Sequence, residues 1–322
     1  MKYLLSVLFG AISYGVLSTI VVLAYGQGYQ LGEVVGTQLL TGFILAWMLA
    51  FYTKQREQRK ARTAPNAISS VTQAAAAAKA LASKLTWKSR VLLMLSGMPT
   101  AITGLLYYHS LRYIPASLAI ILLFQFTWIS VLIQAFSKRQ RPKGIMMLAL
   151  IVLFGGTLLA AGIMEDGAAQ FNWIGIIFGL LSAVSYSLFI LFSGKAVPAV
   201  HPAYRSAWMI TGGLLLVFIL FPPMFLFNGL IWGQLLVFGF LLGLFGAFIP
   251  PVLFAIGVPH IGEGMAGVLG AAELPVAVTM SALILNEHVS MLQWVGVAIV
   301  LMGILLPELK RFKGRSQRTM AA

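Results

Sequence analysis

The chain has 322 residues, of which 60% are hydrophobic and only 9% are charged, and its mean hydropathy is +0.92. In a soluble globular protein, roughly a quarter of the residues are charged. No soluble fold has enough interior to bury this much apolar surface. The net charge of +14 does not indicate nucleic-acid binding, because most basic residues lie between or beyond apolar runs, where membrane topology explains them. The composition therefore predicts an all-α integral membrane protein.

Ten apolar runs follow one another along the chain, and each is long enough to cross ~30 Å of hydrocarbon as a helix. The first run could imitate a signal peptide, but it has no clear cleavage site and further runs follow it, so it is predicted to be the first span. The predicted transmembrane helices cover residues 3–25, 31–52, 91–111, 116–136, 144–163, 173–193, 207–227, 235–258, 264–285 and 291–307.

Charge supports this topology. With the N-terminus in the cytoplasm and the spans alternating, every Lys and Arg except Arg112 falls on the cytoplasmic side, as the positive-inside rule requires. A wrong number of spans would scramble this partition. We therefore predict a multi-pass protein of the cytoplasmic (inner) membrane with both termini in the cytoplasm.

Two sequence matches at fixed offsets indicate an internal repeat. Ser13-Tyr14 recurs as Ser185-Tyr186, 172 positions later, and residues 114–159 match residues 261–306 at an unbroken offset of 147. Because each half holds an odd number of spans, the second half must enter the membrane from the opposite side. The prediction is therefore ten transmembrane helices arranged as two inverted five-helix repeats.

The offsets also predict the domain boundaries. They differ by 25 residues, so the first half carries an insertion, and the basic, alanine-rich segment at about 54–90 is the place for it. This segment is either a solvated cytoplasmic loop or a weak contact for anionic lipid headgroups. The repeats then cover residues 1–163 and 164–309, and a basic cytoplasmic tail follows at 310–322.

Several motifs resemble a known family. They are Glu273-Leu274-Pro275-Val276, Asn286-Glu287-His288 and Gln293-Trp294-Val295-Gly296 within residues 253–306, and Tyr113-Ile114-Pro115-Ala116-Ser117 within residues 107–160. They resemble the EamA repeat of the drug/metabolite transporter superfamily. The resemblance implies a ten-helix carrier of the bacterial cytoplasmic membrane, often an exporter of amino acids, metabolites or toxic compounds. The motifs identify the family and not the substrate.

The first repeat departs from this pattern. It has Phe126 and Trp128 where the second repeat has Glu273 and Pro275, and Gln140 where the second has Glu287. A scheme that couples transport through two symmetric carboxylates is therefore in doubt.

Glu273 lies near the middle of the ninth predicted span, and Pro275 removes a backbone N–H donor two residues later. A carboxylate at membrane depth is costly and usually faces a cavity or a partner. Glu273 is therefore the candidate for proton coupling. A structural role, protonated or hydrogen-bonded to a neighbouring helix, stays open.

Other polar and aromatic residues within the spans are candidates for a substrate cavity. The repeat-related Ser-Tyr pairs could present hydroxyls near the pseudo-axis, or serve close helix packing. Gln125 either joins neighbouring helices by hydrogen bonds or contacts the substrate. His109 either titrates near neutral pH or belongs to an aromatic belt at the membrane interface. The candidates are Tyr14, Tyr186, Ser13, Ser185, Gln125, Trp128, Tyr108 and His109.

Prolines mark the candidate kinks. Pro99 in the third span and Pro250-Pro251 in the eighth occupy comparable spans of the two halves. Together with Pro275 they are predicted to bend helices and permit rocking of one half against the other.

The leading hypothesis is a secondary transporter that exports small organic solutes by alternating access. Few fixed charges and many aromatic residues suggest neutral, zwitterionic or amphipathic substrates. A membrane-embedded enzyme acting on lipid or isoprenoid substrates is the alternative. Such enzymes usually place several polar catalytic groups at a membrane interface, whereas the polar groups of this chain are sparse and scattered. A channel is a third possibility. Ten spans suffice for a complete carrier, so a monomer is expected and a homodimer stays open.

Cofactors are not expected. The chain has no cysteine, which excludes disulfides and thiolate ligands, and it has neither a Walker-type phosphate loop nor a His-Glu-x-x-His motif. No metal site and no catalytic residue is predicted. The expected partners are a small-molecule substrate and membrane lipids.

Overall fold

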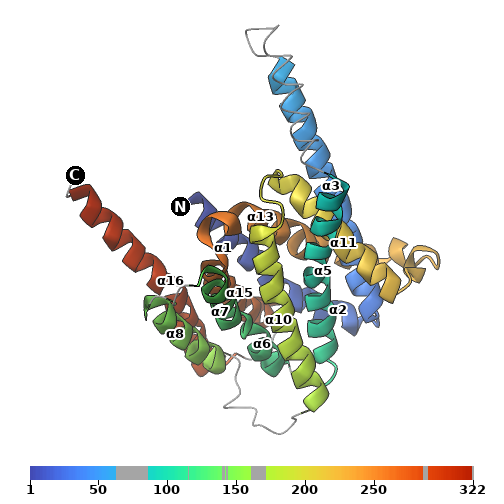
Figure 1. The fold of residues 1–322 in the computed structure, drawn as a ribbon. Helices are drawn as coiled ribbons and strands as arrows, with labels where there is room; N and C mark the ends of the chain where they lie inside the picture. The colour runs from blue at the N-terminus through green and yellow to red at the C-terminus, as the bar shows by residue number, and fades with distance from the viewer. Residues whose placement is uncertain are drawn as a thin grey trace.

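The computed structural model describes residues 1–62, 86–114, 116–139, 142, 144–160, 172–285 and 289–320, and within them the chain forms helices and no strand. Figure 1 shows these helices side by side in a bundle, with α3 and α16 projecting beyond it. The first half contains α1 (Lys2–Gly15), α2 (Leu17–Gly26), α3 (Leu31–Arg62), α5 (Trp87–Ser110), α6 (Ala116–Phe124), α7 (Phe126–Lys138) and α8 (Gly144–Ala160). The second half contains α10 (Trp173–Lys195), α11 (Pro202–Leu220), η1 (Met224–Leu226), η2 (Leu230–Trp232), α12 (Gln234–Leu242), η3 (Gly243–Phe248), α13 (Ile249–Ile261), α14 (Glu263–Gly270), α15 (Glu273–Ile284) and α16 (Met291–Met320).

Many of these helices have the length and composition of membrane spans. Across the described residues, seven helical segments are long and apolar enough to cross a bilayer: Lys2–Gly26, Leu31–Arg59, Trp87–Ser110, Trp173–Lys195, Pro202–Leu220, Gln234–Ile261 and Glu263–Ile284. Three shorter apolar helices are Leu122–Ser137, Gly144–Ala160 and Met291–Pro307. Each predicted apolar run falls on one of these segments. The prediction of an all-α, multi-pass membrane protein is confirmed.

Three predicted spans are interrupted. The first breaks at Val16 between α1 and α2, the fourth at Gln125 between α6 and α7, and the ninth at Ala271-Ala272 between α14 and α15. In the eighth span, η3 is a π-helix that ends at Phe248, one residue before the pair Pro250-Pro251. Neither proline supplies an N–H to the preceding turn, and prolines and π-bulges are both places where the regular helical hydrogen-bond pattern is interrupted.

Some boundaries differ from the predicted ones. The seventh span was expected to reach residue 227, but α11 ends at Leu220 because Pro222 and Pro223 follow. At the insertion, α3 continues to Arg62 and α5 begins at Trp87. Thr86 caps the start of α5, because its hydroxyl oxygen accepts a hydrogen bond from the Ser89 N–H at 3.2 Å. The centre of the insertion lies outside the described residues.

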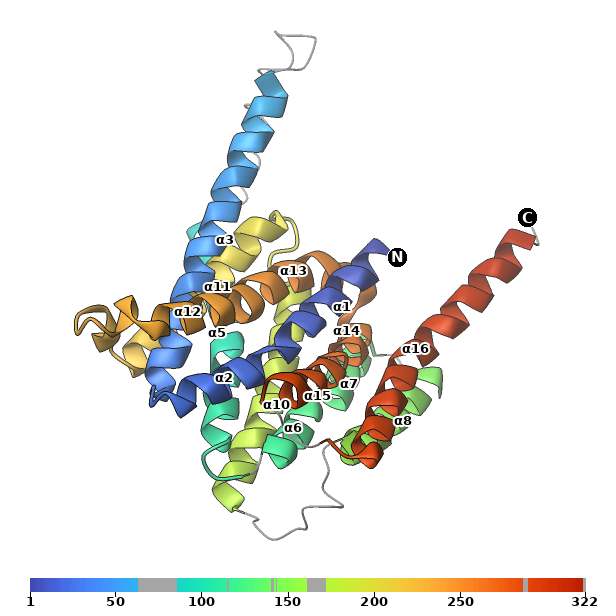
Figure 2. The ribbon, with the colours of Figure 1, turned by 180° about the vertical axis from the view of Figure 1, so that it is seen from behind.

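Small residues allow close helix contacts. A Cβ added to Gly97 of α5 would overlap the main chain of Met209 in α11, and one added to Gly212 of α11 would overlap the main chain of Met94. Elsewhere α1 packs on α13, α10 on α5, α3 on α12 and η3, and α8 on α16. The last pair also lies side by side in Figure 2.

The chain ends give the bundle a direction. The N-terminus, the C-terminal end of α16 and the far end of α3 lie on the same side of the bundle in both views (Figures 1 and 2). We name this the termini side. The other, where α5 ends and α10 begins, is named the opposite side.

Candidate functional site

A cavity lies between the two halves of the chain. Its empty space is about 850 Å³, counting the part that is open to solvent. It is lined by Tyr14, Leu17, Ser18, Val35, Gln38, Leu39, Thr100, Ala101, Thr103, Gly104, Tyr107, Tyr108, Ile120, Leu123, Phe124, Tyr186, Gly246, Ala247, Glu273 and Ala277.

The lining residues lie toward the opposite side. On α5, which enters from the termini side, they run from Thr100 to Tyr108, near its end at Ser110. On α3, which starts at the opposite side, they lie in the early turns, from Val35 to Leu39. The cavity therefore extends from the middle of the bundle toward the opposite side.

Aromatic rings close the cavity toward the termini side. Phe126, Phe189 and Phe254 are all 0% exposed. The Phe126 ring lies 4.4 Å from the ring of Tyr186, and the Phe189 ring lies 5.5 Å from that of Phe254, measured between centroids. We name these three phenylalanines the aromatic floor. Rings packed this closely leave no void large enough for a solute between them.

The rings of Tyr14 and Tyr186 pack against the aromatic floor. Their rings meet edge to face, with centroids 5.6 Å apart and planes at 90°, which is a favourable aromatic geometry. Both line the cavity. The repeat-related tyrosines that the sequence singled out are thus brought together where the two halves meet.

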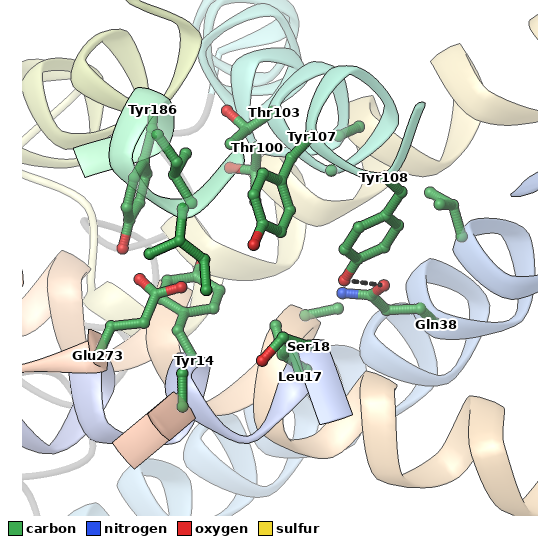
Figure 3. Close-up of a pocket in the computed structure, with 18 of the residues that line it drawn as sticks. Tyr14, Leu17, Ser18, Gln38, Thr100, Thr103, Tyr107, Tyr108, Tyr186 and Glu273 are labelled. Atoms are coloured by element: carbon green, nitrogen blue, oxygen red, sulfur yellow. Dashed lines mark hydrogen bonds between the residues drawn. The ribbon is translucent and has the colours of Figure 1, made fainter. Parts of the chain in front are cut away.

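Glu273 supplies the carboxylate of the cavity. It is the first residue of α15, directly after the break at Ala271-Ala272, and a helix N-terminus favours a negative charge. Its Oε2 atom is buried and finds no hydrogen-bond partner within the described part of the chain, and the same holds for the Tyr186 hydroxyl. Figure 3 shows both groups at the same end of the cavity. Buried polar atoms are normally hydrogen-bonded, so a ligand at this end of the cavity could supply the partners that these two atoms lack.

A second polar group lies at the other end of the cavity, where the Tyr108 hydroxyl donates to the Gln38 side-chain oxygen at 3.5 Å (Figure 3). Tyr108 was among the predicted residues, but Gln38, Tyr107, Thr100, Thr103 and Ser18 were missed. Gln38 had a usable signal, because it is a lone amide within an apolar run.

Five predicted cavity residues do not line the cavity, and four of them make hydrogen bonds elsewhere. The Ser13 hydroxyl donates to the Phe245 carbonyl at 2.7 Å and the Ser185 hydroxyl donates to the Pro99 carbonyl at 2.8 Å. The Trp128 indole N–H donates to the Gln125 oxygen at 2.7 Å, and Trp128 is 42% exposed. These serines join helices, and the Gln125–Trp128 pair faces outward.

His109 also lies outside the cavity lining. Its ring meets Phe178 of α10 edge to face, with centroids 4.7 Å apart, and Tyr113 at 5.3 Å. The histidine thus belongs to an aromatic contact between α5 and α10.

The predicted kink prolines occupy three different settings. Pro99 lies inside an uninterrupted α5, Pro250 and Pro251 open α13, and Pro275 is in the first turn of α15. A first-turn proline costs the helix no hydrogen bond. Whether these sites bend during transport stays a prediction.

Charged groups gather on the termini side. Lys195 Nζ lies 3.9 Å from Glu263 Oε1 and also donates to the Ser137 hydroxyl. Arg205 is 2% exposed and donates to the carbonyls of Ser193 and Ala255. The Ser193 carbonyl lies in the last turn of α10, and the Ala255 carbonyl lacks its usual helical N–H donor because residue 259 is proline. Among the described residues, no group of three or more His, Asp or Glu is placed to hold a metal ion.

Several motif residues cannot be placed: Pro115, Gln140 and residues 286–288 lie outside the described residues.

Comparisons with known proteins agree with this architecture. No curated protein matches the chain. The fold is similar to that of a solved protein crystal structure, with a TM-score of 0.67 over 94% of this chain and 96% of the other, at 16% sequence identity; a likeness at that identity concerns the fold alone. Residues 173–307 match the model of the EamA-like transporter family. The family resemblance predicted from the sequence is therefore confirmed over residues 173–307.

Proposed function

We propose that this protein is a secondary transporter that exports small organic solutes across the cytoplasmic membrane by alternating access. The observation that carries the proposal is the cavity: both halves of the chain line it, and the aromatic floor closes it toward the termini side. The family match supports the transporter class. A monomer is the proposed working unit, because the two halves of one chain suffice to line a cavity.

The proposed architecture is ten transmembrane helices in two inverted repeats. Reciprocal hydrogen bonds support it: Ser13 of α1 donates to the Phe245 carbonyl in the eighth span, and Ser185 of α10 donates to the Pro99 carbonyl in the third. The two serines are 172 positions apart. Inverted repeats relate the first span to the sixth and the third to the eighth, so the two bonds are equivalents of each other.

The helix breaks support the same architecture. Gln125, where the fourth span breaks, is 147 positions before Ala272, where the ninth breaks, and 147 is the offset that relates these spans in the sequence. Both chain ends also lie on one side of the bundle (Figure 1), as an even number of crossings requires.

Orientation sets the proposed direction. If the positive-inside rule holds, the termini side is cytoplasmic and the cavity opens outward, in the state from which an exporter releases its substrate. Opening of the aromatic floor would then admit the next solute. Glu273, the carboxylate in the cavity, is the proposed proton-coupling group, because a buried charge without a partner is costly and exchange of a proton would remove that cost.

Transport into proteoliposomes tests this function. The purified protein is reconstituted and uptake of neutral, zwitterionic and cationic organic solutes is measured, with and without a pH gradient. We expect saturable uptake of one class and counterflow from preloaded vesicles. Glu273→Gln should abolish the response to the gradient, whereas Glu263→Gln, a carboxylate outside the cavity, should keep it.

Each contrary result has a clear meaning. Flux without saturation or counterflow would replace the carrier with a channel. Chemical conversion of a lipid additive without solute flux would point to the enzyme alternative. Equal gradient responses in wild type and Glu273→Gln would remove proton coupling from the proposal.

A further inference from the structure

We propose that the cavity binds monovalent amphipathic organic cations, in which one ammonium group is attached to an apolar body. This inference rests on the proposed transport function and adds the class of substrate to it. Three properties of the lining support it: its charge, its aromatic rings and its apolar wall.

The only charge that the side chains of the described lining carry near neutral pH is the negative charge of an ionised carboxylate. Glu273 is the one acidic residue among the described residues that line the cavity, and none of them is Lys, Arg or His. Its Oε2 atom has no hydrogen-bond donor within reach in the described residues. A buried carboxylate needs a cation or a donor, and a bound ammonium group would supply both. One carboxylate balances one positive charge, which is why the substrate is monovalent.

Aromatic rings surround the same space. Tyr14, Tyr107, Tyr108, Tyr186 and Phe124 all line the cavity, and Figure 3 shows the four tyrosines spread from the Glu273 end to the Gln38 end. An ammonium group is attracted to the face of an aromatic ring, most strongly where water is excluded. The rings therefore favour a cation along the length of the cavity and not only beside the carboxylate.

The rest of the lining suits an apolar body. Leucine, valine and isoleucine side chains from three helices, α2, α3 and α6, contribute to it, as do alanines that leave room for a ligand. They are Leu17, Val35, Leu39, Ala101, Ile120, Leu123, Ala247 and Ala277. Burying apolar ligand surface against such a wall is favourable, so the cation should carry a hydrophobic group.

Zwitterions and anions fit less well. A substrate carboxylate would enter a cavity whose described lining holds no basic partner and already holds Glu273. Arg112, at the opposite side, is exposed and donates to the Gln30 side-chain oxygen at 3.5 Å. Because an exposed charge is largely screened, Arg112 does not change the sign of the cavity.

The test compares ligands that share one apolar body. Isothermal titration calorimetry on the full chain in detergent uses 2-phenylethylamine, its neutral N-acetyl derivative, zwitterionic phenylalanine and permanently charged 2-phenylethyltrimethylammonium. We expect both cations to bind about tenfold or more tightly than the neutral and zwitterionic compounds, the margin of a charge-assisted contact. Equal or tighter binding of phenylalanine or the neutral derivative would overturn the proposal.

Variants locate the binding. Glu273→Gln keeps the shape of the side chain and removes its charge, so it should weaken both cations by about tenfold to a hundredfold and leave the neutral compound unchanged. Glu263→Gln should bind like wild type. Tyr186→Phe keeps the ring and should retain cation binding, whereas Tyr186→Leu should weaken it. Circular dichroism on each variant separates loss of fold from loss of affinity.

The failure of this inference differs from failure of the proposed function. If proteoliposomes take up phenylalanine or the neutral derivative with saturation, but neither cation, the chain is a transporter and the substrate class is wrong. If none of the four compounds binds or moves while the folded protein gives counterflow of another solute, the substrate class is again wrong. If folded protein moves no solute of a broad panel, the transport function fails.

Discussion

The two interrupted helices, α6/α7 and α14/α15, break at comparable positions but differ in the residue that follows the break. Each is interrupted near its middle, at Gln125 and at Ala271-Ala272, and α7 packs directly against α14. The first residue after the break is Phe126 in one helix and Glu273 in the other. Phe126 is fully buried in the aromatic floor, whereas Glu273 lines the cavity.

This difference teaches how one backbone plan can provide two functions. The break places the next side chain at the centre of the bundle in both helices, and residue chemistry then decides its role. A phenylalanine there fills space and closes the path toward the termini side. A glutamate there brings the cavity a negative charge. The four predictions below test this division.

The largest effect is expected from opening the floor. Phe126→Ala should lower the free energy of unfolding by about 3–5 kcal/mol, because removing a fully buried ring leaves a cavity. Phe136→Ala lies on the same helix α7 at a residue that is 81% exposed, and should change it little. Thermal unfolding in detergent measures both. Equal losses in the two variants would contradict the distinction between floor and outer face.

The next effect concerns the contact between the broken helices. A Cβ added to Gly267 of α14 would lie 2.7 Å from the Ser130 Cβ of α7, whereas one added to Gly155 of α8 would meet nothing within 4 Å. Gly267→Val should therefore destabilise the fold by about 1–3 kcal/mol through overpacking, and Gly155→Val should not. Similar unfolding temperatures would show that α7 and α14 can separate at little cost.

The third prediction concerns pH. Binding of 2-phenylethyltrimethylammonium, whose charge does not titrate, should weaken as pH falls, because protonation removes the negative charge of Glu273. The facing groups are Tyr14 of α1, Tyr107 of α5 and Tyr186 of α10, and phenols carry no charge between about pH 5 and pH 8. Calorimetry across that range should show the slope in wild type and a flat profile in Glu273→Gln. A slope that survives the substitution would assign the titration to another group.

The smallest effect concerns one hydrogen bond that joins the broken helices. The Gln134 side-chain oxygen of α7 accepts from the Gly264 N–H of α14 at 2.8 Å. Gln134→Met should cost about 0.6 kcal/mol, the average for interhelical side-chain bonds in membranes. Gln27→Met, at an exposed residue, is the matched control. A loss of several kcal/mol would mean that this bond holds α7 against α14.

The amino-acid sequence by itself determined the class of the molecule. Composition required a lipid environment, and apolar runs located each helical segment, because burying apolar surface and satisfying the backbone leave few alternatives within a bilayer. The sequence also singled out Tyr14, Tyr186, Tyr108 and Glu273, which all line the cavity. A carboxylate or a repeated aromatic within an apolar run is conspicuous without any structure.

Only the tertiary structure decided which polar groups were already satisfied. The Ser13 and Ser185 hydroxyls bond to the carbonyls of Phe245 and Pro99, and no local pattern reveals a partner so distant along the chain. The break at Gln125 was not predicted, because no proline or charge run marks it; the ninth span was predicted to bend at Pro275, and its helix breaks just before that residue, at Ala271-Ala272. The rotation of each helix about its axis depends on packing against all its neighbours, and that rotation separates Gln38 in the cavity from Trp128 on the outer face.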